Sequence, residues 1–94
     1  MVQASWTTPG VFTGQGGVRT DEVGVVTGEL TVRTSWNGGQ ADVKVQYSGT
    51  SGWFTLTGSP VPCPSERNSR NLHQEVVEFV RAGGGTAVPR HDPP

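Results

Sequence analysis

The sequence predicts an α+β fold, in which a four- to five-stranded antiparallel β-meander is followed by one C-terminal helix packed on one sheet face. Three observations predict this fold. From Asp21 onward, apolar and polar residues alternate with the period of two that half-buried strands have. Glycine-containing turn signals separate the alternating stretches. Near the C-terminus the apolar period changes to that of an amphipathic helix.

The chain has 94 residues, which suits a single domain with a modest hydrophobic core. We therefore expect the folded monomer to be marginal or to be supported by a partner. The formal net charge is −1, from 7 basic and 8 acidic residues. This balance disfavours partners that bind through strong electrostatics, such as duplex DNA or an anionic membrane.

Cys63 is the only cysteine, so an internal disulfide framework is excluded and an oxidising compartment is not indicated. The N-terminal stretch lacks the basic and apolar regions of a signal peptide, and no apolar run is long enough to span a membrane. The sequence thus predicts a cytoplasmic protein. Arginine greatly outnumbers lysine, and together with many glycines and valines this bias suggests a bacterial genome of high GC content.

Residues 1–20 allow two interpretations. The stretch VQASWTT can form a strand with Trp6 on the core face, which adds a fifth strand beside the meander. Alternatively, the segment is an arm that packs Trp6 or Phe12 onto the sheet or onto a neighbouring subunit. Turn signals at Pro9-Gly10 and at the glycine-rich run 14–17 fit either interpretation.

Residues 21–58 form the predicted meander. As a two-residue hairpin loop, Thr27-Gly28 gives the cross-strand pairs Val25–Leu30 and Val23–Val32. As the next such loop, Gly38-Gly39 gives the pairs Trp36–Ala41, Thr34–Val43, Val32–Val45 and Leu30–Tyr47. Both registers place one apolar set on the same face, and a slip of one residue breaks that agreement. The predicted sheet core is Val23, Val25, Leu30, Val32, Trp36, Ala41, Val43, Val45 and Tyr47.

The fourth strand of the meander spans residues 52–58, and its parity is ambiguous. We assign Phe54 and Leu56 to the core face, opposite Tyr47 and Val45, which leaves Trp53 on the other face or at the loop edge. Residues 59–64 contain three prolines, which cannot donate to a ladder, so this segment is predicted to be an extended crossover.

A helix is predicted over residues 65–82. Its apolar stripe consists of Leu72, Val76, Phe79 and Val80. Asn71 is a candidate N-cap, and Ser65 and Ser69 compete with it, so the helix starts between residues 65 and 71. Gly83 is the C-terminal stop, and the Gly- and Pro-rich tail, residues 83–94, is expected to be mobile.

Three residues are candidates for chemistry, and each has a simpler structural interpretation. His73 lies near the start of the helix and off its apolar stripe, and His91 lies in the tail, so both are expected to be exposed to solvent. Cys63 precedes the helix, where a thiol pKa can be lowered, but a small residue tucked under the crossover is favoured. No metal-ligand spacing or cofactor motif is present, so we expect neither a metal nor a cofactor.

The face of the sheet that points away from the helix is the candidate binding surface. The inferred registers set Glu22 opposite Arg33, and Arg33 opposite Lys44. Like charges directly across a pair of strands destabilise a sheet unless something compensates, and Glu22 can do so. The candidate binding residues are Arg33, Lys44, Gln46 and Trp53. An ordinary solvated face is the simpler interpretation of the same residues.

Two functions are compatible with these features. The first is a small non-enzymatic interaction or regulatory module that acts as a homodimer, because an open sheet has edges that invite pairing with a second copy or another protein. The alternative is a protein that binds single-stranded nucleic acid on the outward sheet face, which the net charge disfavours. An enzyme is not expected, because the candidate catalytic groups do not cluster in the sequence.

Overall fold

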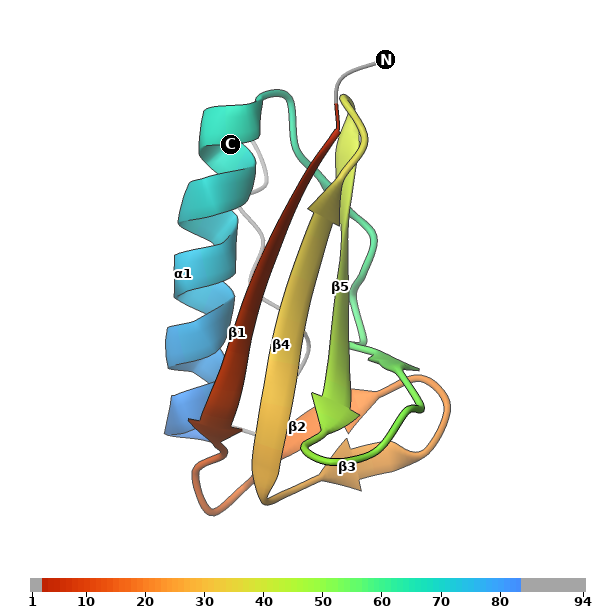
Figure 1. The fold of residues 1–94 in the computed structure, drawn as a ribbon, viewed down its shortest axis with the longest axis vertical. Helices are drawn as coiled ribbons and strands as arrows, with labels where there is room; N and C mark the ends of the chain where they lie inside the picture. Colours follow the sequence, from red (N-terminus) through yellow and green to blue (C-terminus); the bar gives the residue numbers. More distant parts are fainter. Residues whose placement is uncertain (1–2, 84–94) are drawn as a thin grey trace.

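The computed structural model describes residues 3–83 and confirms the predicted α+β class, with an antiparallel sheet and one C-terminal helix (Figure 1). The main sheet has the strand order β1-β4-β5-β6, with β7 also paired to β5, and a second sheet joins β2 to β3. The elements are β1 (Ala4–Phe12), β2 (Val18–Thr20), β3 (Gly24–Val26), β4 (Glu29–Trp36), β5 (Gln40–Tyr47), β6 (Phe54–Thr55), β7 (Val61–Pro62) and α1 (Glu66–Ala82).

The β4–β5 hairpin has the predicted register. Trp36 pairs with Ala41, and the ladder continues to Leu30 opposite Tyr47. Asn37 N–H donates to the carbonyl of Gln40 at 3.1 Å, which closes the loop around the two central glycines. A short loop determines the register of a hairpin locally, so this part of the sheet could be predicted from sequence.

The first predicted hairpin is wrong. β3 pairs with β2, and the place beside β4 belongs to β1, which sets Val11 opposite Leu30 and Thr8 opposite Val32. The residues expected to start a strand, 21–23, form a turn instead. The Thr20 hydroxyl accepts from Val23 N–H at 3.2 Å and donates to the Gly24 carbonyl at 2.7 Å, so local hydrogen bonds compete with pairing to β4.

This change of partner alters the core. Val23 and Val25 were expected inside the sheet, but they are 53% and 50% exposed, and Tyr47 is 37% exposed at the end of β5. Val18 and Val26 of the β2–β3 hairpin are buried instead. The other predicted sheet positions are buried: Leu30, Val32, Trp36, Ala41, Val43 and Val45.

The β2–β3 hairpin closes the lower end of the molecule, below β4 and β5 in Figure 1. Asp21 N–H donates to the carbonyl of Thr55 at 2.9 Å, and Thr57 N–H donates to the carbonyl of Arg19 at 3.0 Å. These bonds attach β2 to the outer side of β6. The sheet therefore curls around the core, and the hairpin seals its lower end.

Two short strands share the outer side of β5. Phe54 and Leu56 point inward as predicted, but Phe54 stands opposite Val45 and not Tyr47, a shift of two residues that keeps the face. After Leu56 the crossover segment comes back to β5, where Val61 pairs with Ala41. The crossover prolines thus flank or end a two-residue edge strand, where a missing N–H is tolerated.

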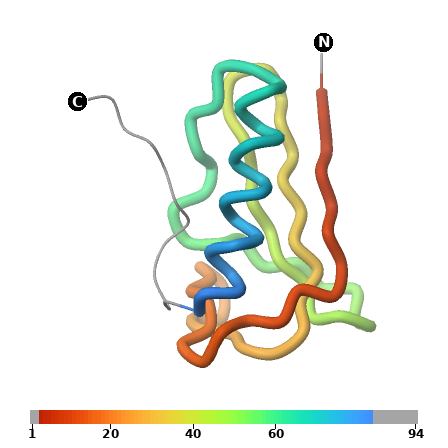
Figure 2. The backbone as a smooth tube through the Cα atoms, turned by 90° about the vertical axis from the view of Figure 1, so that its left-hand side faces the viewer, coloured from red at the N-terminus to blue at the C-terminus, as the bar shows by residue number. Residues whose placement is uncertain are grey.

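Helix α1 packs on β1 and β4 and runs alongside them (Figure 2). Its N-cap is Ser65, whose hydroxyl accepts from Asn68 N–H at 3.1 Å, so Asn71 lies inside the helix and is not the cap. Gly83 ends the helix in the left-handed region, as predicted. Within residues 3–83, no helix has the length and apolar character needed to cross a bilayer. The predicted mobile tail beyond Gly83 and His91 lie outside the described residues.

Candidate interaction surfaces

One face of the sheet is left open by α1. Along β4 and β5, buried residues alternate with exposed or half-exposed ones, so every second side chain points away from the helix. We call this surface the outward face. Its residues on these two strands are Glu29, Thr31, Arg33, Ser35, Gln40, Asp42, Lys44 and Gln46.

A transverse row of polar side chains crosses the outward face. Arg33 stands directly opposite Lys44, as predicted, with Thr7 on its other side. Lys44 in turn stands opposite Thr55 of β6. The row therefore runs hydroxyl, guanidinium, ammonium, hydroxyl across four strands. Among residues 3–83, neither of its cations has a carboxylate oxygen within 4.0 Å.

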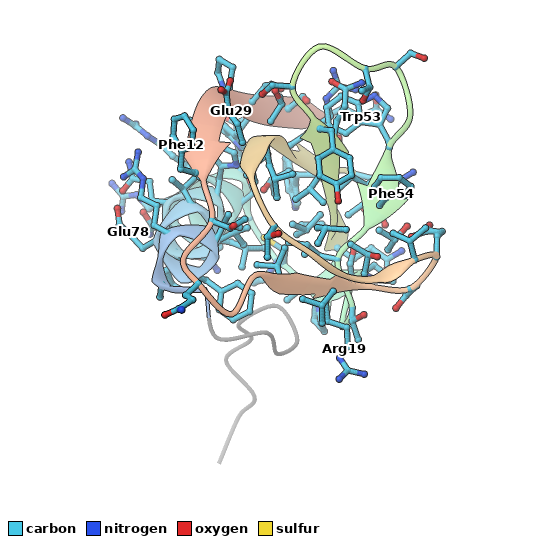
Figure 3. All side chains as sticks on the ribbon, turned by 90° about the horizontal axis from the view of Figure 1, so that it is seen from below. Phe12, Arg19, Glu29, Trp53, Phe54 and Glu78 are labelled. Carbon is cyan, nitrogen blue, oxygen red and sulfur yellow. The ribbon has the colours of Figure 1, made fainter. Side chains whose placement is uncertain are left out.

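Trp53 and Arg33 are brought together on this face. The guanidinium carbon of Arg33 lies 4.5 Å from the centroid of the Trp53 ring, which is a cation–π contact. Gln46 pairs with Thr31, next to the Arg33–Lys44 pair. Figure 3 shows Trp53, Glu29 and the exposed Phe12 along one side of the molecule, and Arg19 on the opposite side. The predicted binding residues thus lie on one continuous surface.

Glu22 does not stand opposite Arg33, because β1 occupies that position. Its carboxylate accepts from Thr55 N–H at 2.7 Å. This backbone hydrogen bond, with smaller contributions from the Thr55 hydroxyl and from nearby Lys44, lowers the pKa of the Glu22 carboxyl below its ordinary value. Glu22 is therefore ionised at neutral pH. It offsets the charge of Lys44, whereas the sequence predicted that it would offset the charge of Arg33.

The outer edge of β1 is the second surface of interest. Hydrogen-bonded and non-hydrogen-bonded pairs alternate along an antiparallel ladder. Asn37 bonds to β5, and Ser48 N–H donates to the carbonyl of Glu29 at 3.1 Å. Hydrogen-bonded pairs recur every second residue between Glu29 and Asn37, so the backbone groups of the odd-numbered residues of β4 bond to β5. The even-numbered residues, such as Thr34, therefore bond to β1.

On β1 the same alternation decides which backbone groups are free. Trp6 stands opposite Thr34, so its N–H and C=O face β4. Ser5 and Thr7 therefore direct their backbone N–H and C=O groups away from the sheet. β1 ends the strand order, so no other strand among residues 3–83 lies along that edge.

Few of the usual devices protect this edge. Charged side chains and prolines commonly discourage pairing of an edge strand. The segment Ala4–Phe12 contains no charged residue. Its one interruption is a bulge between Thr8 and Val11, at Pro9 and Gly10. The stretch before the bulge is therefore an edge that has neither charged residues nor prolines.

His73 is buried, and the expectation that it faces solvent is wrong. It is 7% exposed, with Nε2 at 2.8 Å from the Thr8 hydroxyl and Nδ1 at 2.9 Å from the Thr34 hydroxyl. Burial lowers the pKa of this imidazole below its ordinary value. His73 precedes Val77 by four residues and Val80 by seven, and this spacing would have placed it on the buried stripe.

The contacts of His73 form a clamp between α1 and the sheet. Both ring nitrogens are engaged by threonines, one from β1 and one from β4. One turn earlier, Trp6 Nε1 donates to the Ser69 hydroxyl at 2.9 Å. These hydrogen bonds fasten α1 to the two strands beneath it, and they position β1 with its outer edge free.

Cys63 packs in the core beneath the crossover, as its structural interpretation predicted. Burial raises the pKa of its thiol, which donates weakly to the Ser65 carbonyl at 3.5 Å. Both ring nitrogens of His73 are engaged by the Thr8 and Thr34 hydroxyls, and the thiol contacts the Ser65 carbonyl instead. Within the described part of the chain, no three His, Cys, Asp or Glu side chains gather as a metal site requires.

Comparison of the chain with protein-family models, curated proteins and solved structures found no match in any of the three. The outward face and the β1 edge are thus the features from which a function can be argued.

Proposed function

We propose that the protein is a small non-enzymatic interaction module that acts as a homodimer through the outer edge of β1. The observation that carries the proposal is the direction of the Ser5 and Thr7 backbone groups, which point away from β4 on an uncharged edge. Free backbone donors and acceptors in this arrangement are a template for another strand. A cytoplasmic location is part of this proposal, because a chain with one cysteine cannot build the internal disulfides common in oxidising compartments.

A second copy fits this edge by symmetry. An antiparallel pair of identical strands has a two-fold axis, and an axis at Trp6 sets Ser5 of each copy opposite Thr7 of the other. Each such pair exchanges backbone hydrogen bonds in both directions. The half-buried Trp6 side chains then meet across the axis, on the side of the sheet that carries α1.

The position of α1 favours the same arrangement. Neighbouring strands lie about 4.8 Å apart. Because α1 packs over β1 and β4, pairing of two β1 strands brings the two helices to about 10 Å from each other, which is the separation of packed helices. The dimer would therefore extend the sheet and the helical layer together.

Replacing Thr7 tests the proposal. Proline at this position removes an N–H that faces outward and leaves the ladder to β4 intact, whereas Thr7→Val keeps the N–H. Analytical ultracentrifugation at micromolar concentration should find a dimer for the wild type and for Thr7→Val, and a folded monomer for Thr7→Pro. A monomeric wild type contradicts the proposal.

A second measurement covers the case in which Thr7→Pro fails to fold. Amide hydrogen exchange of the wild-type protein should show Ser5 and Thr7 protected at high concentration and exchanging rapidly on dilution. Equal exchange at both concentrations also contradicts the proposal.

Binding of single-stranded nucleic acid is the second candidate, favoured by the Arg33–Trp53 contact. Three acids oppose it, because Glu29 and Asp42 share the parity of the outward face and Glu22 lies beside Lys44. A long polyanion on this face would meet these carboxylates. Fluorescence anisotropy with a labelled oligonucleotide at low salt tests it, and we expect no binding.

A further inference from the structure

The geometry points to a site for a single phosphate group on the outward face, between Arg33 and Lys44. Such a site goes beyond the proposed dimerisation, because it uses side chains of the open face and not the backbone of the β1 edge. The ligand class is a phosphate monoester or inorganic phosphate.

Arg33 and Lys44 are like charges that Glu22 offsets only from the Lys44 side, without an ion pair to either cation. Arg33 and Lys44 form a directly opposed cross-strand pair, and such pairs are destabilising for charges of one sign. Neither cation is ion-paired within the described residues. An anion placed between them attracts both and removes their mutual repulsion. The electrostatic free energy of binding is therefore more favourable than an anion would gain from either cation alone.

Arg33 is also held in place before a ligand binds. Its guanidinium is held 4.5 Å from the centroid of the Trp53 ring. A guanidinium held over an aromatic ring has lost part of its rotamer freedom before any ligand arrives, so less entropy is lost on binding. Within residues 3–83, the Arg33 guanidinium forms no ion pair, so its N–H donors remain for a ligand. Those donors suit two oxygens of one phosphate.

A threonine hydroxyl ends the row on each side. Thr7 stands beside Arg33, and Thr55 stands beside Lys44. The Thr7 hydroxyl can donate to a phosphate oxygen that the cations do not reach, whereas the Thr55 hydroxyl already hydrogen-bonds the Glu22 carboxylate. Three strands, β1, β4 and β5, therefore contribute available donors to one transverse row, and α1 does not cover it.

The carboxylates on this face limit the size of the anion. Glu22 lies near Lys44 and competes for its charge, while Asp42 and Glu29 stand farther along β5 and β4. A compact phosphate at the Arg33–Lys44 pair avoids the two more distant acids. A polyanion that follows the strands does not, which is why the site is assigned to one phosphate group.

The test is a titration of isotope-labelled protein with inorganic phosphate, followed by amide NMR at constant ionic strength. We expect saturable shifts centred on the row of Thr7, Arg33, Lys44 and Thr55. Arg33→Gln and Lys44→Gln should each weaken binding about tenfold, because each removes a charge-assisted hydrogen bond. If Arg33→Gln disturbs the position of Trp53, Lys44→Gln still tests the site, because Lys44 is not the residue that contacts this ring.

Two further variants make the test specific. Glu22→Gln keeps an acceptor for Thr55 N–H but removes the competing charge, so it should tighten binding. Arg19→Gln removes an exposed cation from the opposite side of the molecule and should leave binding unchanged (Figure 3). Shifts that do not saturate, or that weaken equally in Arg19→Gln and Arg33→Gln, overturn the proposal.

The source of the phosphate is tested with adenosine monophosphate and a phosphoserine peptide. Tighter binding of either ligand than of inorganic phosphate supports the site and identifies what surrounds the phosphate. Equal binding of all three supports a site that recognises the phosphate alone. Absence of binding by all three overturns the site, whatever the oligomeric state is found to be.

Discussion

The side chain of His73 connects three elements through two hydrogen bonds. A neutral imidazole has one donor and one acceptor nitrogen, so one threonine donates to the ring and the other accepts from it. The Thr34 hydroxyl is fully buried, and loss of the ring leaves it without this partner. A residue expected on the surface is thus part of the core.

Replacing His73 with alanine should therefore be costly. The change removes both hydrogen bonds and opens a cavity under α1, so we expect the free energy of unfolding to fall by about 2–4 kcal/mol. Urea denaturation followed by circular dichroism measures this. The neighbouring exposed Gln74→Ala is the control, with an expected change below about 0.5 kcal/mol. Equal effects of the two substitutions would show that the clamp does not stabilise the fold.

The same histidine makes stability depend on pH. Its pKa is lowered in the folded state, so below the ordinary value of about 6.5 the unfolded chain binds a proton that folded His73 does not. This contribution to stability is complete above that pH and is lost as the pH falls through the folded-state pKa. The wild type should lose more stability than His73→Gln between about pH 7.5 and pH 5. If the free energy of unfolding falls equally in the two proteins over this pH range, His73 is not the source of the pH dependence.

Among the elements, the C-terminal end of α1 is held by backbone contact with the loop after β1. Gly14 N–H donates to the carbonyl of Val80 at 3.1 Å. A Cβ added at Gly14 would lie 2.5 Å from the Ala82 carbonyl oxygen. Only glycine allows this approach, so the helix end depends on a residue about seventy positions earlier in the chain.

Gly14→Ala should thus destabilise the protein. Backbone atoms must shift to admit the methyl group, and we expect a loss of about 1–3 kcal/mol. Gly39→Ala is the matched control, because its added Cβ meets nothing within 4 Å and its φ is not positive. Thermal unfolding of both variants measures the difference. Equal midpoints would contradict the close contact at Gly14.

The start of α1 offers a second test at this scale. Ser65 is the N-cap, and its removal leaves the Asn68 N–H without its acceptor. Ser65→Ala should lower the free energy of unfolding by about 1 kcal/mol, whereas Ser65→Asp should preserve it. Asn71→Ala, at another of the three cap candidates, should have little effect. A larger loss for Asn71→Ala would place the helix start later in the chain.

For the whole molecule, the proposed dimer couples stability to concentration. When folding and association are linked, each tenfold rise in protein concentration stabilises the dimer by about 1.4 kcal/mol. Differential scanning calorimetry should therefore show a wild-type midpoint that rises with concentration and a constant midpoint for Thr7→Pro. A wild-type midpoint that does not change with concentration contradicts the dimer.

The sequence by itself determined the features that depend on neighbouring residues. The β4–β5 register follows from a two-glycine loop, and the opposition of Arg33 and Lys44 on the candidate face follows from that register. The stripe of α1 and its stop at Gly83 follow from helical period and capping. In each case the interacting residues lie within a few positions or across a tight turn.

Only the tertiary structure decided which strand lies beside β4. Residues 21–26 and β1 both have patterns that fit that place, and alternation alone does not rank two such candidates. β1 is the longer strand, and the clamp from α1 holds it through Trp6 and Thr8. The competing segment turns at Thr20 instead. Pairing between distant segments depends on what the rest of the chain stabilises, and the exposed edge of β1, the burial of His73 and the place of Glu22 all follow from that choice.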